Sequence, residues 1–140
     1  SSSTASRYTG GTMTWPLPGY YFISSDFEMR DHPITGQYQQ HTGIDLPAPK
    51  NTQIVAAASG TVVTVGYNTA YGNRVIINHG GGVQTLYAHM TSYAVSEGDT
   101  VSAGDVIGYV GSTGYSTGNH LHFSVLVNGS YVDPKPYVQG

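Results

Sequence analysis

The sequence of 140 residues contains no cysteine, which excludes disulfides, thiol catalysis and cysteine-ligated zinc. Only 9% of the residues are charged, and 5 basic against 8 acidic side chains leave a formal net charge of −3. A chain with so little positive charge lacks the basic surface of a nucleic-acid-binding protein or of a protein that clings to anionic membranes. No apolar run approaches the roughly 18 residues of a membrane span. We therefore expect no nucleic-acid partner and no membrane insertion.

The length suits one domain with a single core. Residues 1–12 are rich in Ser, Thr and Gly without periodicity, which is typical of a linker or a disordered tail. We expect the folded domain to span residues 13–140. Because the chain begins at Ser1 and not at methionine, one interpretation is that a leader or an upstream domain has been removed.

Short runs of β-branched residues alternate with turn signals in the rest of the chain, and no long amphipathic helix pattern interrupts them. The expected strands lie at residues 61–65, 74–79, 83–89, 106–110, 120–127 and 131–133. Three glycines at 80–82 and the pair Asn128-Gly129 predict two hairpins. The pattern predicts a single all-β domain whose mainly antiparallel sheet folds over on itself.

Six histidines stand out in a chain with so few charges. Alternation along residues 120–127 places His120, His122 and Ser124 on one face of a strand and the apolar residues between them on the other. We expect the apolar face to pack on the core and the histidine face to point outward. Two imidazoles on one face can converge on an ion or a substrate atom, or they can be ordinary exposed side chains.

A second potential site lies at residues 41–45, which read HTGID. In an extended segment His41 and Asp45 face the same way, while Ile44 and Leu46 point into the core. One imidazole and one carboxylate are plausible metal ligands, although such pairs are also common on protein surfaces.

The other three histidines are less informative by themselves. His89 is expected to share a strand face with Thr85 and Tyr87, where a structural role is the local interpretation. His79 ends a strand before three glycines, so a turn role is favoured over catalysis, and we expect its replacement to cost a modest amount of stability. His32 precedes Pro33, and nothing local assigns it.

These segments, in this order, resemble the lysostaphin-type zinc endopeptidases, a family of metalloenzymes that cleave peptidoglycan. The resemblance covers about residues 14–138 and implies a barrel-sandwich hybrid fold with long loops that form a groove. It rests on WPLPG at 15–19, HPITG at 32–36, HTGIDL at 41–46, LYAHM at 86–90, the glycine-rich stretch 98–114, HLH at 120–122 and VDP at 132–134. The HxxxD and HxH motifs together form a specific signal, whereas either alone does not.

The resemblance implies that His41, Asp45 and His122 bind one Zn²⁺ per chain, and that His89 and His120 are catalytic histidines that bind no metal. Two imidazoles and one carboxylate leave zinc an open position for a water, whose pKa falls to about 7 on such a site. One catalytic histidine would accept the water proton and pass it to the leaving amine, and the other would stabilise the oxyanion. Which does which stays open.

Two positions depart from the family pattern. Asn119 precedes the HxH motif where proline is common, and Ser124 stands where an acidic residue is frequent. Neither is a predicted ligand, so the departures concern the rigidity of the loop and the surroundings of His122.

The substrates that the resemblance implies are peptides of bacterial peptidoglycan, cut at Gly-Gly bonds or at bonds that contain D-Ala or another small residue, in cross-bridges or stem peptides. Tyr38, Tyr71 and Tyr115 lie in loop-like segments and are candidate groove residues, because their rings pack on glycine-rich backbone and donate hydrogen bonds. They can equally be ordinary surface or core tyrosines. The enzyme so implied is a monomeric bacteriolysin, secreted or associated with the cell wall.

Two other functions compete with this one. A domain of this fold can lose zinc and serve as a peptidoglycan-binding or hydrolase-activating module, but all five key positions are present here. Residues 101–110 have a spacing similar to that of lipoyl or biotinyl carriers, which need an exposed lysine at a hairpin tip. Lys50 and Lys135 do not lie in such a turn.

Overall fold

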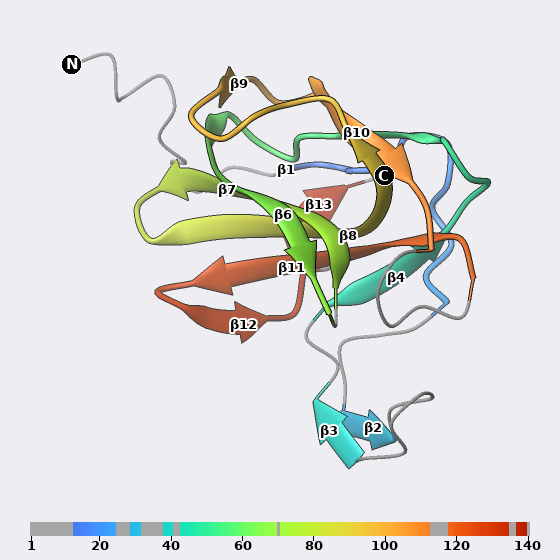
Figure 1. Ribbon diagram of the computed structural model, residues 1–140. Helices are drawn as coiled ribbons and strands as arrows, with labels where there is room; N and C mark the ends of the chain where they lie inside the picture. The colour runs from blue at the N-terminus through green and yellow to red at the C-terminus, as the bar shows by residue number, and fades with distance from the viewer. Residues whose placement is uncertain are drawn as a thin grey trace.

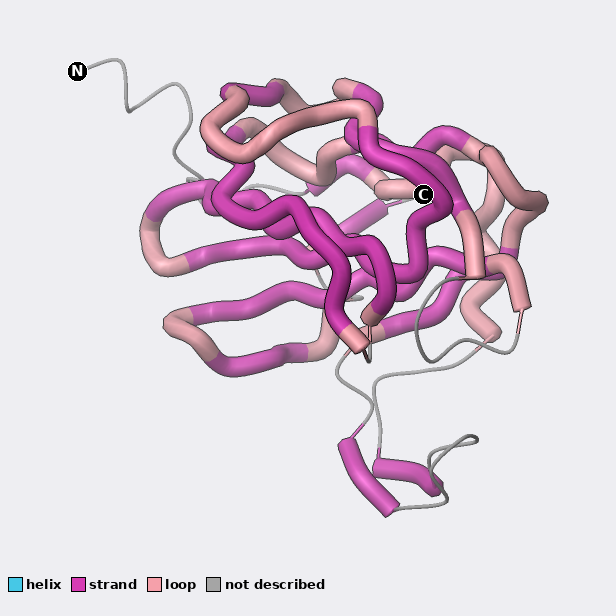
Figure 2. The backbone as a smooth tube through the Cα atoms, viewed as in Figure 1, coloured by secondary structure: helices cyan, strands magenta, loops and turns pink. Residues whose placement is uncertain are grey.

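The computed structural model describes residues 13–24, 29–31, 38–40, 43–69, 71–112, 118–134 and 137–139, and this part of the chain contains strands and no helix (Figures 1 and 2). Within the same residues no helix is long and apolar enough to cross a membrane. The strands are β1 (Met13–Thr14), β2 (Met29–Asp31), β3 (Tyr38–Gln40), β4 (Ile44–Pro47), β5 (Gln53–Val55), β6 (Gly60–Asn68), β7 (Gly72–Gly80), β8 (Val83–Tyr93), β9 (Thr100–Val101), β10 (Val106–Val110), β11 (His120–Val127), β12 (Ser130–Val132) and β13 (Val138–Gln139).

One sheet dominates the fold and runs in the order β12-β11-β8-β7-β6-β9. Its long strand β8 pairs with β7 along one edge and changes partner along the other. There it pairs with β11 as far as Ala88 and with β10 from Met90 onward. Strand β4 lies against the first half of β11, on the edge away from β8. All these pairs are antiparallel, as the sequence predicts.

The two predicted hairpins are confirmed. Strands β7 and β8 are paired across the glycine turn, and β11 pairs with β12 across Asn128 and Gly129. Both turn residues have positive φ, 51° and 84°, as a tight type I′ turn requires. The predicted strands at 106–110 and 120–127 coincide with β10 and β11.

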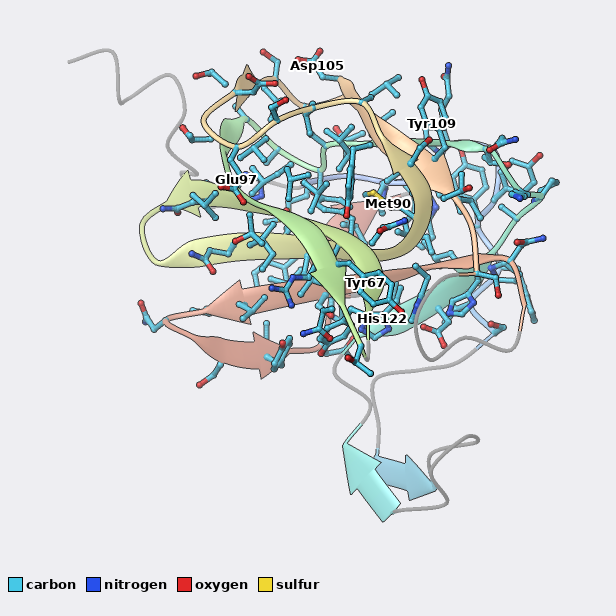
Figure 3. All side chains as sticks on the ribbon, in the orientation of Figure 1. Tyr67, Met90, Glu97, Asp105, Tyr109 and His122 are labelled. Carbon is cyan, nitrogen blue, oxygen red and sulfur yellow. The ribbon has the colours of Figure 1, made fainter. Side chains whose placement is uncertain are left out.

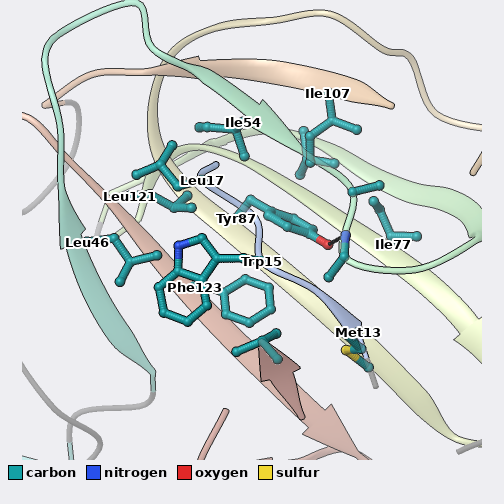
Figure 4. Packing of buried hydrophobic residues seen from close by; sticks show 14 of the residues in the cluster. Met13, Trp15, Leu17, Leu46, Ile54, Ile77, Tyr87, Ile107, Leu121 and Phe123 are labelled. Carbon is teal, nitrogen blue, oxygen red and sulfur yellow. Dashed lines mark hydrogen bonds between the residues drawn. The ribbon is translucent and has the colours of Figure 1, made fainter. Parts of the chain in front are cut away.

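The core lies on one face of the main sheet, where the first and last described segments close over it. Met13 of β1 pairs in parallel with Val138 of β13, and both are buried. Figure 4 shows Trp15 beside the rings of Tyr87 and Phe123, which pack with their centroids 5.4 Å apart. Full burial of a side chain such as Phe123 contributes roughly 1.5–3 kcal/mol. The apolar face of β11 therefore packs on the core, as predicted.

The predicted all-β, mainly antiparallel fold is confirmed, and the sheet is open and not closed into a barrel, since β12 and β9 end its main path within the described residues. The predicted tail at 1–12 and several of the loops expected to form a groove, such as 113–117, lie outside the described residues. Lys50 lies in an exposed turn between β4 and β5, and these strands pair with β11 and β10 rather than with each other. That turn is therefore not the hairpin tip of a carrier domain.

Candidate metal centre

The pairing of β4 with β11 brings two predicted metal ligands together. Asp45 stands directly opposite His122 in this register, although 77 residues separate them in the chain. Gly43 lies so close to β11 that a Cβ there would meet the carbonyl oxygen of Phe123 and lie 2.6 Å from the Ser124 Oγ. The glycine of the HTGID segment is thus required by the close approach of the two strands.

Asp45 and His122 form the centre of the site, which Figure 3 shows with His122 labelled. The Nδ1 of His122 lies 2.9 Å from Asp45 Oδ1, and its Nε2 lies 3.0 Å from the Ser124 Oγ. The His122 ring is buried, with 4% of its surface exposed, and Ser124 is fully buried. The expectation that this face of β11 points outward is therefore wrong for these two residues, because other side chains cover it.

Ser124 fills the position where the family pattern has an acidic residue. A histidine that binds metal through one ring nitrogen usually donates its other N–H to an oxygen acceptor, which holds the ring in place. With Nδ1 bound to a metal, the Ser124 Oγ would be such an acceptor for the Nε2–H, while Nδ1 is directed at Asp45. The departure from the family pattern thus keeps a hydrogen-bond partner for His122.

His120 reaches the same carboxylate from two residues earlier in β11. Its Nδ1 donates to the carbonyl oxygen of Gly118 at 2.9 Å, and its Nε2 lies 3.6 Å from Asp45 Oδ1. Because a carbonyl only accepts, Nδ1 carries the proton and Nε2 is left to face the site. The prediction that His120 and His122 share one face of the strand is confirmed.

His89 joins the site through a break in strand β8. Its φ is +62°, and β8 has one more residue than β7 between the pairs Val75–Tyr87 and Asn73–Met90. The predicted sharing of a face with Thr85 and Tyr87 is wrong, because those two side chains are buried on the core side. The bulge turns His89 to the other face, where its ring centroid lies 4.9 Å from that of His120 and 6.0 Å from that of His122. Backbone strain of this kind costs about 1–3 kcal/mol and is typical of functional sites.

Among the candidate groove tyrosines, Tyr71 lies at the site. Its ring centroid is 5.5 Å from that of His122, and its carbonyl oxygen accepts the N–H of His89 at 2.8 Å. The side chain of Tyr38 and all of Tyr115 lie outside the described residues, as do the predicted ligand His41 and His32.

His79 lies in the core instead. It is fully buried, with Nδ1 2.8 Å from the carbonyl oxygen of Ser59 and Nε2 2.7 Å from the Thr85 Oγ1. The predicted structural role agrees with this position, but the side chain is embedded in the fold rather than exposed at a turn. Burial lowers the pKa of His79, and the hydrogen bond to Ser59 opposes this effect only in part.

The described donor atoms fit a zinc ion. Ligand atoms about 2.0–2.1 Å from a tetrahedral zinc lie about 3.3 Å from one another, and the two predicted ligand atoms that the structure describes, Asp45 Oδ1 and His122 Nδ1, lie 2.9 Å apart, close to this spacing. The described residues contain no complete group of three such side chains around one point. With His41 outside them, the full ligand set remains a prediction.

Comparison with known proteins gives a consistent result. The model of peptidase family M23 matches residues 39–134. The chain is 48% identical over 125 residues to the DD-carboxypeptidase/endopeptidase Mpg of Neisseria meningitidis, with 89% of this chain and 29% of that protein covered. It is 43% identical over 114 residues to the peptidoglycan DD-endopeptidase ShyC of Vibrio cholerae, with 81% and 26% covered. The chain thus spans less than a third of these relatives.

Two solved structures have the same fold. A zinc-containing peptidase from Vibrio cholerae superimposes with a TM-score of 0.79 at 36% identity, over 85% of this chain and 37% of that one. The catalytic domain of lysostaphin from Staphylococcus simulans, an antimicrobial peptidase, superimposes with a TM-score of 0.77 at 34% identity, over 86% of this chain and 93% of that domain. Sequence and fold thus indicate the same family for the domain that holds Asp45, His122 and the neighbouring histidines. The chain belongs to peptidase family M23.

Proposed function

We propose that this chain is a zinc-dependent endopeptidase domain that hydrolyses peptide bonds of bacterial peptidoglycan. The observation that carries the proposal is the convergence of Asp45, His122, His120 and His89 on one face of the sheet. The family membership and the names of the relatives, two of which are DD-endopeptidases, support the same reaction.

His41, Asp45 and His122 would hold the zinc ion. When bound, zinc activates a water molecule and polarises the carbonyl of the bond to be cut. Asp45 supplies a carboxylate oxygen, and Ser124 holds the His122 ring in orientation through Nε2.

His120 and His89 would move protons and stabilise charge. Because Nδ1 is bound to Gly118, Nε2 is the nitrogen of His120 that faces the site beside Asp45, and it would accept or donate the proton. His89 lies against it, with the two ring centroids 4.9 Å apart. A pair of imidazoles at this separation can act on two sides of one reacting carbonyl, one as the general base and the other as a hydrogen-bond donor to the oxyanion.

For the substrate, we favour bonds that involve D-Ala over Gly-Gly bonds. The relatives at 48% and 43% identity carry DD specificity in their names, whereas the lysostaphin domain is less similar at 34%. Secretion and action at the cell wall follow from such a substrate and belong to the same proposal.

The test is the release of fragments from purified peptidoglycan with different cross-links, analysed by mass spectrometry with zinc present. We expect fragments with a new C-terminal D-Ala from wild type and none from His120→Ala. New N-terminal glycine would instead identify a glycyl endopeptidase. If no wall type gives fragments while the protein still binds to the walls, the chain is a binding module and the proposed reaction is wrong.

A further inference from the structure

A second group of polar side chains lies on the same face of the sheet as the candidate metal centre. Arg74 precedes the fully buried Val75 in β7, so alternation points Arg74 away from the core. Tyr131 of β12 pairs with Leu126, while its neighbour Val132 pairs with the buried Val125. The same alternation therefore places Tyr131 on the face that carries His122.

Tyr71 connects this group to the centre. Its ring packs against His122, and its hydroxyl donates to the Tyr131 hydroxyl at 3.3 Å. Because Tyr131 accepts this bond, its own proton is left to donate to another group. Burial and the contact with Tyr71 raise the pKa of Tyr131, while the positive charge of Arg74 acts in the opposite direction. Tyr131 is therefore a neutral hydrogen-bond donor, and it lies close enough to Arg74 for the positive charge of Arg74 to affect its pKa.

Arg74 itself is incompletely paired. Its Nε is buried and has no hydrogen-bond partner among the described residues. A buried N–H without an acceptor costs about 1–3 kcal/mol, and arginine presents its donors in a planar fork that matches a carboxylate. Arg74 thus offers a positive charge and a buried Nε–H that has no acceptor in the described part of the chain, and Tyr131 offers a hydroxyl proton beside it.

We propose that Arg74 and Tyr131 form a carboxylate-binding subsite beside the metal centre, which selects peptides carrying a free carboxylate next to the cleaved bond. This inference rests on the proposed peptidase function and adds the feature of the substrate that the enzyme recognises. The carboxylate is either the C-terminus of the leaving residue or a side-chain carboxylate on that residue, and both have the same chemistry.

The experiment uses two matched pairs of D-Ala-containing peptides. In the first pair, the two peptides differ at the C-terminus of the leaving residue, which is a carboxylate in one and a carboxamide in the other. In the second pair, the side chain of the leaving residue ends in a carboxylate in one peptide and in a carboxamide in the other. We expect the wild-type kcat/KM to be higher for the carboxylate than for the carboxamide by about 10- to 100-fold in one of the pairs. The pair that shows the preference identifies the source of the carboxylate.

The variants assign the preference to the subsite. Arg74→Gln should bring the ratio close to one, Arg74→Lys should leave an intermediate ratio, and Tyr131→Phe should lower the ratio by a smaller factor. Lys50→Gln removes one positive charge from the exposed turn and should keep the wild-type ratio. If Arg74→Gln does not fold, Arg74→Lys and Tyr131→Phe provide the same test.

Two outcomes would overturn the subsite. One is a wild-type ratio near one in both pairs, and the other is an equal loss of kcat/KM for both members of a pair when Arg74 is replaced. Failure of wild type to cleave any of the four peptides or purified peptidoglycan would instead contradict the proposed function.

Discussion

Histidines lie on both faces of the main sheet, and their hydrogen-bond partners differ. On the core face, His79 donates to Ser59 and accepts from Thr85, whose Oγ1 lies 2.6 Å from the Tyr87 hydroxyl. The Tyr87 hydroxyl in turn accepts the N–H of Ala57 at 3.0 Å. This chain of bonds uses both ring nitrogens of His79 within the protein, so the residue stabilises the fold and has no nitrogen left for chemistry.

On the opposite face, His120 and His122 each have one ring nitrogen on a carbonyl or hydroxyl group and direct the other at a carboxylate. Asp45 Oδ1 lies within 3.6 Å of nitrogens from both His120 and His122. An imidazole nitrogen and a carboxylate oxygen directed at one point are what a zinc ion binds. The comparison teaches that the partners of a histidine, rather than its burial, distinguish the structural role of His79 from the role proposed for His122, since both residues are buried.

The largest effect is expected from His122→Ala. Loss of the predicted ligand should remove zinc and reduce peptide cleavage to background, because the remaining two ligands bind the ion too weakly. Metal analysis of the purified protein and fragment release from peptidoglycan measure the two losses. Retention of a full equivalent of zinc would contradict the role of His122.

His120→Ala should separate catalysis from metal binding. We expect zinc to stay bound while kcat falls by about 10²–10⁴-fold, the usual contribution of a general acid or base. The same metal analysis and fragment assay apply. Zinc lost as completely as from His122→Ala would show that His120 is a ligand, and the division of roles would then be wrong.

Ser124→Ala removes the partner of His122 Nε2 without touching a predicted ligand. Loss of such a contact to a ligand typically costs about 10- to 100-fold in metal affinity or activity, so we expect a weaker zinc Kd in a competition titration with a chelator. Ser124→Thr keeps the hydroxyl and serves as the matched control. Equal zinc affinity of Ser124→Ala and wild type would mean that the hydrogen bond does not support the site.

His79→Ala should act on stability alone. It removes the side-chain partner of the Ser59 carbonyl and one of the two partners of Thr85 Oγ1, and it opens a cavity. We therefore expect a loss of about 2–4 kcal/mol in the free energy of unfolding, more than the modest cost expected from the sequence. Urea denaturation measures this loss. The kcat/KM of the folded protein should stay at the wild-type value, and a large fall there would place His79 in the catalytic machinery.

The pH dependence of stability gives the smallest effect. Burial lowers the pKa of His79 in the folded state, so below about pH 6.5 the unfolded chain binds a proton that the folded chain does not. The stabilising contribution of His79 is present above pH 6.5 and declines as the pH falls. The Tm difference between wild type and His79→Ala should therefore narrow from pH 8 to pH 5, and a constant difference would contradict the prediction.

Local sequence was sufficient for much of the fold. Alternation in residues 120–127 predicted β11, its apolar face and the shared face of His120 and His122, because side chains in a strand have a strict period of two. Asn128-Gly129 predicted the β11–β12 hairpin, because few residues adopt two successive positive φ angles. The family resemblance also implied that Asp45 and His122 bind the same ion, although no local signal places them opposite each other.

His89 and Arg74 are two residues whose positions local sequence patterns do not predict. The face of His89 was predicted wrongly because the bulge in β8 depends on its change of partner from β11 to β10, which involves residues far apart in the chain. No motif in β7 marks Arg74, and only the tertiary contacts of Tyr71 and Tyr131 place it in the proposed subsite.

The sequence by itself thus determined the longer strands, the two hairpin turns and the residue types available for chemistry, because these depend on backbone preferences and on alternation over a few residues. The tertiary structure decided which histidines lie beside a carboxylate, which are buried in the core and on which face of the sheet His89 lies. These outcomes depend on strand pairing and burial, which join residues that are as far apart as Asp45 and His122.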